Sequence, residues 1–224
     1  FTHILWQPWQ DASQHLSKLF LDFEPGIHFP QLQMNAGETG INILRIYSPI
    51  KNSLEQAKIN IQFNFWENLQ LKFEQVGLKL NESKVSLQNV RNFYTKSKNN
   101  KYFGLWSKIY SNENITIHFG IEIDHNIYFG FTIEKDEKGG ISELEEFNEI
   151  RRFISDMDTN YTYSKYWLGW KHTKPKLNFR EFSSDEVINL SDNDYLKETV
   201  KSIVEEAMED IKAVQKKLKT ITMI

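Results

Sequence analysis

The sequence predicts an α+β fold: an antiparallel meander sheet of about four to five strands packed on amphipathic helices, with a long C-terminal helix. Three observations predict it. Residues 101–135 contain three aromatic and β-branched runs separated by two polar turns. Residues 53–76 and 192–218 each carry apolar side chains at helical spacing. These patterns place one sheet and at least two covering helices in the same chain.

The composition excludes several classes of function. The 224 residues include 16 Phe, 9 Tyr and 6 Trp, which favours a well-packed core over disorder. The absence of cysteine excludes a disulfide framework, a thiolate metal site and a cysteine nucleophile. A net charge of −3 gives no global attraction to nucleic acid, although a local basic patch can still bind it. Without a signal peptide or a long apolar run, we expect a cytoplasmic protein with no membrane partner.

Two parts are expected along the chain: an accessory N-terminal segment at residues 1–52 and the α+β domain at residues 53–224. Within the first, the pattern predicts a short helix over residues 13–23 and a strand over residues 40–47, ended by Pro49. Because the first residue is Phe1 and not Met, we expect a fragment of a longer protein. The richness in Asn, Lys and Ile suggests a bacterial source.

The first helix of the domain is predicted to begin after Ser53, a suitable N-cap, and to end before Gly77, a suitable C′ residue. A shorter helix is predicted within residues 85–94. The apolar face of the first helix recurs at spacings of three, four and seven through Leu54, Ile61, Phe65, Leu69, Phe73 and Val76.

The meander follows, with turns predicted at residues 112–114 and 124–126, where Asp and Asn tolerate left-handed conformations. Alternation places two sets of side chains on opposite faces of the middle strand. We therefore expect one face to be covered by helices and the other to be more open. The covered set is Ile115, Ile117, Phe119, Ile121 and Ile123, and the open set is Thr116, His118, Gly120, Glu122 and Asp124.

After a break at Gly139 and Gly140, a helix is predicted over residues 141–157 and a strand over residues 161–170. A short helix is expected to start near residue 183. The final helix, over residues 192–218, has acidic residues in its first half and lysines in its last turns, as the helix dipole favours.

Four residues form a candidate metal site. An acidic residue followed, after the next strand, by an Asp-x-Lys is the spacing that Mg²⁺-dependent nucleases use, with carboxylates holding the metal and a lysine supporting the attacking water. The alternative interpretation is a hairpin turn and a solvated charged loop. No histidine pair or H-E-x-x-H occurs, which argues against a zinc enzyme. The candidate residues are Glu122, Asp124, Asp136 and Lys138.

A basic and aromatic run between residues 161 and 176 is the better binding candidate. Lysines neutralise phosphates, and aromatic rings stack on bases. The alternative interpretation is a strand whose aromatic side chains fill the core, followed by a solvated loop. The nucleic-acid-binding candidates are Lys165, Trp170, Lys171, His172, Lys174 and Lys176.

Three segments resemble the C-terminal part of a bacterial group within the PD-(D/E)XK nuclease superfamily: residues 64–69 (NFWENL), 102–106 (YFGLW) and 121–131 (IEIDHNIYFGF). In that group the metal-binding residues lie upstream of these motifs. The resemblance therefore implies a domain attached to a nuclease half, with no catalytic residue and no cofactor of its own.

The expected function is thus the non-catalytic C-terminal domain of a nuclease-like bacterial protein that binds DNA or a partner, in restriction or phage defence. Two alternatives stay open. One is an Mg²⁺-dependent nuclease complete in this chain. The other is a protein-interaction or homo-oligomerisation module that uses the helix at residues 192–218.

Overall fold

A computed structural model of the chain describes residues 36–81, 85–95 and 102–221, with side chains from residue 48 onward. The contacts divide the chain into two units, Phe1–Ile50 and Lys51–Ile224. The first described element is helix α2 (Ala36–Gln75). The helix predicted over residues 13–23 lies outside the described residues.

Helix α2 corrects two predictions. Residues 40–47 are helical, so the predicted strand there was wrong, and Ser53 lies inside the helix and does not cap it. Pro49 lies inside α2 as well. Local preference is a weak determinant of secondary structure, and here the helix continues through residues that favour strands and through a proline.

The C-terminal end of α2 was predicted correctly, and its hydrogen bonds explain why. Gly77 has a φ of 87°, and the N–H groups of Gly77 and Leu78 donate to the carbonyls of Glu74 and Phe73 at 3.0 Å each. This is a Schellman motif, in which a glycine takes the left-handed conformation. Leu78 and Phe73 both belong to the core, so the motif ends the helix and turns the chain toward the sheet.

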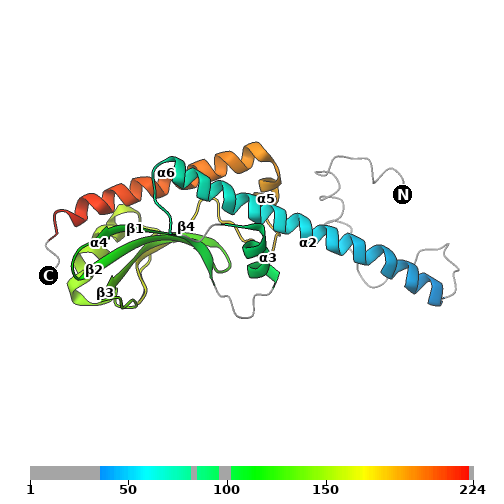
Figure 1. The fold of residues 1–224 in the computed structure, drawn as a ribbon, viewed down its shortest axis with the longest axis horizontal. Coiled ribbons are helices and arrows are strands. Elements are labelled where there is room, and N and C mark those ends of the chain that lie inside the picture. The colour runs from blue at the N-terminus through cyan, green and yellow to red at the C-terminus, as the bar shows by residue number, and fades with distance from the viewer. Residues whose placement is uncertain (1–35, 82–84, 96–101, 222–224) are drawn as a thin grey trace. The chain divides into compact units, whose positions relative to one another are not determined.

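The sheet has four antiparallel strands in the order β1-β2-β3-β4 (Figure 1). The three predicted strands of the meander and both predicted turns are confirmed. The fourth strand begins later than predicted and extends to His172. The bounds are β1 (Phe103–Ser111), β2 (Ile115–Ile123), β3 (Ile127–Lys135) and β4 (Trp167–His172).

Ser142 explains why both the fourth strand and the helix before it start late. Its N–H donates to the carbonyl of Lys165 at 3.1 Å, and its hydroxyl donates to the carbonyl of Ser164. These bonds hold residues 141–144 against the segment before β4, so the predicted helix over 141–157 begins only with the 3-10 turn η1 (Glu145–Phe147) and α4 (Asn148–Met157).

The remaining elements include α3 (Leu87–Thr95), α5 (Asp185–Ile188) and the 3-10 turn η2 (Asn189–Ser191). The longest helix after α2 is α6 (Asn193–Leu218), as predicted. Asp192 caps it, because its carboxylate accepts from the N–H groups of Asp194 at 3.0 Å and Tyr195 at 2.9 Å.

The core lies between the sheet and the helices on one of its faces. Helix α6 and the second half of α2 run over the same side of the sheet (Figure 1). The inward side chains of β2 are buried, and so is the predicted inner side of α6: Leu196, Val200, Ile203, Val204, Ala207, Ile211, Val214 and Leu218. The α+β class is confirmed. Among the described helices, none combines the length and the apolar character that crossing a membrane requires.

Candidate functional site: an aromatic groove on the open sheet face

The strand register places the outward side chains in three rows across the open face. Glycines at the centre of the middle row leave space above the sheet, because they carry no side chain. The first row is Gly104, Glu122, Tyr128 and His172; the middle row is Trp106, Gly120, Gly130 and Trp170; the third row is Lys108, His118, Thr132 and Trp167.

The tryptophans and Tyr128 fill that space as one aromatic cluster. The Trp106 ring lies over Gly120, where a Cβ atom would come within 2.5 Å of it. Trp106 and Trp167 stack with ring centroids 5.5 Å apart and planes 28° apart. Tyr128 meets Trp167 and Trp170 edge-on, each at 5.5 Å between centroids. Aromatic packing of this kind fixes a rigid floor.

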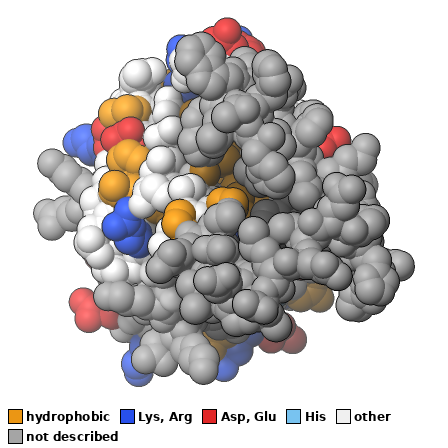
Figure 2. Space-filling view, turned by 90° about the vertical axis from the view of Figure 1, so that its right-hand side faces the viewer, with side chains coloured by type: hydrophobic (Ala, Val, Ile, Leu, Met, Phe, Trp, Pro, Cys, Tyr) orange, Lys and Arg blue, Asp and Glu red, His pale blue; other side chains and the backbone are white. Residues whose placement is uncertain are grey.

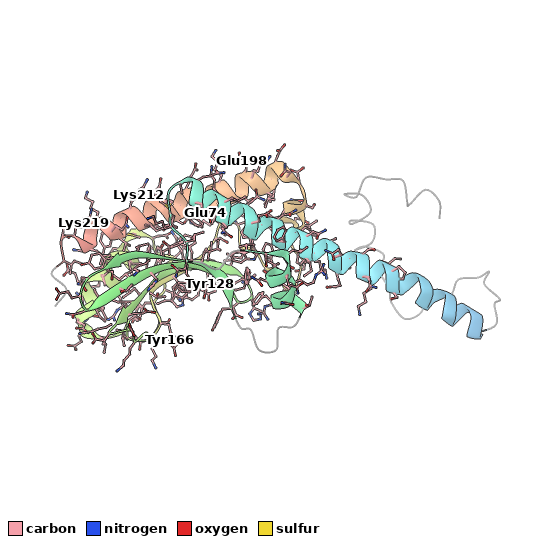
Figure 3. The ribbon with its side chains drawn as sticks, viewed as in Figure 1. Glu74, Tyr128, Tyr166, Glu198, Lys212 and Lys219 are labelled. Carbon is pink, nitrogen blue, oxygen red and sulfur yellow. The ribbon has the colours of Figure 1, made fainter. Side chains whose placement is uncertain are left out.

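This floor belongs to a groove of about 640 Å³. Two exposed tyrosines form part of its wall: Tyr102 is 48% exposed and Tyr166 is 61% exposed. Tyr166 projects on the side of the sheet away from α6, which carries Glu198 and Lys212 (Figure 3). Other lining residues are Asn81, Trp106, His118, Glu122, Tyr128, Glu134, Gly140 and Trp167. We call this the aromatic groove.

Glu122 supplies one of the two carboxyl groups that line the aromatic groove, and Glu134 supplies the other. The Tyr128 hydroxyl donates to Glu122 Oε2 at 2.8 Å. Burial raises the pKa of Glu122, and the hydrogen bonds from Tyr128 and Trp106 partly oppose that rise. Burial and the neighbouring Glu122 both raise the pKa of Tyr128, so the phenol stays protonated and keeps donating.

Two histidines complete the polar character of the face. His118 Nε2 lies 3.4 Å from Glu134 Oε2. Nδ1 of His172 is buried and finds no hydrogen-bond partner among the described residues. Burial lowers the pKa of His172, which favours its neutral form. The face therefore combines flat rings with the carboxyl groups of Glu122 and Glu134, two histidines and Lys108.

The structure brings only some of the predicted nucleic-acid-binding residues to this face. Trp170 and His172 lie on it, in neighbouring rows. Lys165 is exposed beside the aromatic groove, with Nζ 5.7 Å from the centroid of the Tyr166 ring. Lys174 and Lys176 are exposed in the loop that follows β4.

Lys171 is the exception, and its predicted role was wrong. Its side chain is 3% exposed and lies on the helix-covered face, opposite Phe129. Burial lowers the pKa of Lys171, but hydrogen bonds with Glu206 and Asp210 raise it by more. Its Nζ lies 3.1 Å from Asp158, 2.8 Å from Glu206 and 2.9 Å from Asp210. The ammonium group is thus occupied by carboxylates and closed to a phosphate.

This buried cluster was missed from the sequence. Tyr161 joins it, because its hydroxyl donates to Asp210 Oδ2 at 2.8 Å. One signal pointed to it: Glu206 and Asp210 stand four residues apart on α6, close to its inner side. Nothing in the sequence paired them with Lys171, because that pairing depends on which face of β4 the lysine takes.

The residues of the metal-site alternative do not meet. Asp124 lies in the β2–β3 turn, with Oδ1 3.5 Å from His125 Nδ1. Asp136 and Lys138 follow the far end of β3, where Lys135 pairs with Ile115. Asp124 therefore lies at one end of the β2–β3 hairpin, and Asp136 and Lys138 lie beyond the other end. A strand of nine residues is roughly 25 Å long, which is the separation of the two ends. Glu122 is engaged by Tyr128. Within the described ranges, no three His, Cys, Asp or Glu side chains gather as a metal site would need.

A family comparison matches residues 1–63 to the FAD binding domain of DNA photolyase. No curated protein matches the chain. No solved structure matches it either.

The family match corrects three expectations. The family that the chain is similar to, over residues 1–63, is a photolyase FAD-binding domain and not a PD-(D/E)XK nuclease. The predicted nuclease likeness was therefore wrong, and with it the role in restriction or phage defence. The cofactor prediction, none or Mg²⁺, was also wrong, because the matched domain is described by its binding of FAD.

The described side chains of the matched range, from residue 48 onward, contribute to a cavity that is too small for a whole FAD. Four of its residues, Glu55, Lys58, Ile59 and Gln62, line a cavity of about 310 Å³. Cavities of this size are at the lower end of those that enclose small ligands. FAD joins two nucleotide-sized halves, so this cavity provides room for one half at most.

Proposed function

We propose that the unit Lys51–Ile224 is a non-catalytic binding domain whose aromatic groove engages single-stranded DNA. One observation carries the proposal: the floor of stacked rings over Gly120, with the exposed tyrosines Tyr102 and Tyr166 in its wall. Stacking a base on an aromatic side chain contributes about 1–3 kcal/mol and tolerates any base.

Charge next to the rings supports a nucleic-acid ligand. Lys165 lies beside Tyr166, so a base on the tyrosine ring places its phosphate near the lysine ammonium. Lys174 and Lys176 add cations in the loop after β4. The net charge of −3 gives no global attraction to nucleic acid. On the face that Figure 2 shows, the coloured acidic and basic side chains are intermixed.

A single strand suits this groove better than a duplex. The bases of a duplex are stacked inside the helix, whereas those of a single strand are free to turn onto protein rings. The exposed rings of Tyr102 and Tyr166 in the wall of the groove accept such turned bases, and the Glu122–Tyr128 pair offers hydrogen-bonding groups to their edges.

The family match favours DNA over a protein partner, because the matched domain is that of a protein described as a DNA photolyase. A cytoplasmic location is also part of the proposal. It is supported by the absence of cysteine from the sequence, which is typical of proteins that rely on no disulfide.

Oligomerisation through α6 receives no support. The apolar side chains of this helix are buried in the core of the same chain. The large exposed hydrophobic side chains of the described residues lie on other elements. A dimer built on α6 would have to use its charged face.

The test is fluorescence anisotropy of the full chain with a labelled oligothymidine of about 20 nucleotides, over a series of salt concentrations. Tyr166→Ala is expected to weaken binding about fivefold or more, because it removes a stacking ring. The matched control is Tyr163→Ala, an equally exposed tyrosine outside the groove, and its affinity should stay within about twofold of wild type.

Lys165→Ala is expected to lower the slope of log K against log salt concentration by about 0.7, the value for one phosphate contact on a single strand. No measurable binding, or equal losses in Tyr166→Ala and Tyr163→Ala, would reject the aromatic groove as the DNA site.

A further inference from the structure

A second cavity, separate from the aromatic groove, lies between α2, α3 and the loop after β4. Its volume is about 310 Å³, and it shares no lining residue with the groove. We propose that this cavity binds a nucleoside monophosphate. Three features of its wall support this ligand class: a buried unpaired acceptor, flat aromatic sides and two cations.

The unpaired acceptor is Gln62 Oε1. The Gln62 side chain is 3% exposed, and its Nε2 donates to the carbonyl of Phe179 at 2.9 Å. Its Oε1 finds no hydrogen-bond partner among the described residues. Exchanging the amide oxygen and nitrogen would lose the bond to Phe179, so the assignment is fixed by that contact. A buried acceptor without a donor calls for a ligand with an N–H or O–H group, as the edge of a nucleobase provides.

The aromatic sides come from Phe93, Phe179 and Phe182. Phe179 and Phe182 stack with centroids 6.0 Å apart and planes 23° apart. Phe182 has a φ of 49°, in the left-handed region that bulky residues rarely adopt. Such strained residues gather at ligand sites, where the surrounding structure holds them in place. Phe182 lines the cavity, and Lys58 Nζ lies 5.8 Å from the centroid of its ring.

The cations are Lys58 and Arg180, both of which line the cavity. Lys58 Nζ lies 3.4 Å from Glu55 Oε1, and Arg180 Nη2 lies 3.8 Å from Asp124 Oδ1. Ion pairs of this exposed kind are weak, so a phosphate competes for both cations. Glu55 contributes a carboxylate to the lining, so the charged side chains around the cavity carry one net positive charge.

The size of the cavity favours a mononucleotide over larger nucleotides. It suits a planar base with one sugar and one phosphate, and it is too small for a dinucleotide. The polar acceptor then meets the base edge, while the cations meet the phosphate. A free nucleoside lacks the anion, and inorganic phosphate lacks the ring.

The experiment titrates the full chain, labelled with ¹⁵N, with each of the four ribonucleoside 5′-monophosphates, and follows the Gln62 side-chain amide by NMR. Saturable shifts of that resonance are expected below about 1 mM for at least one nucleotide, with weaker shifts for its nucleoside and for inorganic phosphate. Arg180→Met should weaken binding about tenfold or more, because a charge-assisted contact is lost. Lys51→Met, which removes an exposed cation of α2 outside the cavity, should change binding by less than twofold.

Two further variants separate this site from the aromatic groove. Tyr166→Ala should leave nucleotide binding at the cavity unchanged, and Arg180→Met should leave oligothymidine binding unchanged. The proposal is overturned if no nucleotide shifts the Gln62 amide, or if Arg180→Met and Lys51→Met bind alike. Either result leaves the DNA-binding proposal intact, because that proposal depends on Tyr166 and Lys165.

Discussion

The indole of Trp106 lies over Gly120 of the neighbouring strand, so closely that a Cβ atom on the glycine would come within 2.5 Å of the ring. The two residues face each other directly in the register of β1 and β2. The glycine is therefore required by its neighbour's side chain and not by a turn. This contact sets the height of the groove floor, since Trp167 stacks on the same indole.

Replacing Gly120 with Ala should lower the free energy of unfolding by about 1–3 kcal/mol, because the rigid Trp106 ring has to move. Tryptophan fluorescence should change in the folded state as Trp106 separates from Trp167. Urea denaturation of the full chain measures the stability. The control is Gly139→Ala, where an added Cβ meets nothing within 4 Å, and the change there should stay below about 0.5 kcal/mol. Equal effects at both glycines would contradict the packing described for Trp106.

Replacing Lys171 with Met should lower the free energy of unfolding by about 3 kcal/mol or more. The substitution keeps the length of the side chain but leaves Asp158, Glu206 and Asp210 without their shared cation. Chemical denaturation at neutral pH tests this. Lys174→Met, at an exposed position of the following loop, serves as the control and should change stability by less than about 0.5 kcal/mol. A loss at Lys171 no larger than the control's would show that the cluster contributes nothing to stability.

Asp158 should make stability fall in acid. A hydrogen bond from the Asn160 backbone N–H, with help from Lys171, lowers the pKa of Asp158 from 3.8 to about 2. A folded pKa below the unfolded one gives stability that is present above pH 3.8 and lost as the pH falls toward about 2. Denaturation midpoints of wild type and Asp158→Asn, compared across that range, should converge as the pH falls. A constant difference would count against the shift.

Glu122 should change stability with pH in the direction opposite to Asp158. Burial raises its pKa above the ordinary 4.5, so ionisation costs stability as the pH rises from 4.5 through the folded pKa. Glu122→Gln mimics the protonated form, so its stability relative to wild type should rise as the pH increases above 4.5. Tyr128→Phe, which removes the donor at 2.8 Å, should enlarge the cost of ionising Glu122. Parallel pH profiles for wild type and Glu122→Gln would contradict the burial of this carboxyl group.

The sequence by itself determined the meander, the buried side of α6 and the middle of the buried side of α2; Leu54 and Val76, which were predicted on that side of α2, are exposed. Apolar residues alternate along residues 115–123 and recur at helical spacing in α2 and α6. A repeat of two residues is typical of a strand with one buried face, and a repeat of 3.6 residues is typical of a helix with one buried side. Gly77 was readable as a helix end for the same local reason: glycine takes the left-handed conformation there at little cost.

The tertiary structure alone decided which face of β4 each side chain takes, and with it the fate of Lys171. The register of β4 shifts between Phe131 and Thr132, so both Trp167 and Trp170 reach the open face while Lys171 turns inward. A register shift is a property of the pair of strands, and the residues of β4 alone do not reveal it. The nearness of Glu206, Asp210 and Lys171 likewise joins elements far apart in sequence, and no local pattern encodes it. The aromatic groove and the cavity at Gln62 follow from the same kind of long-range pairing.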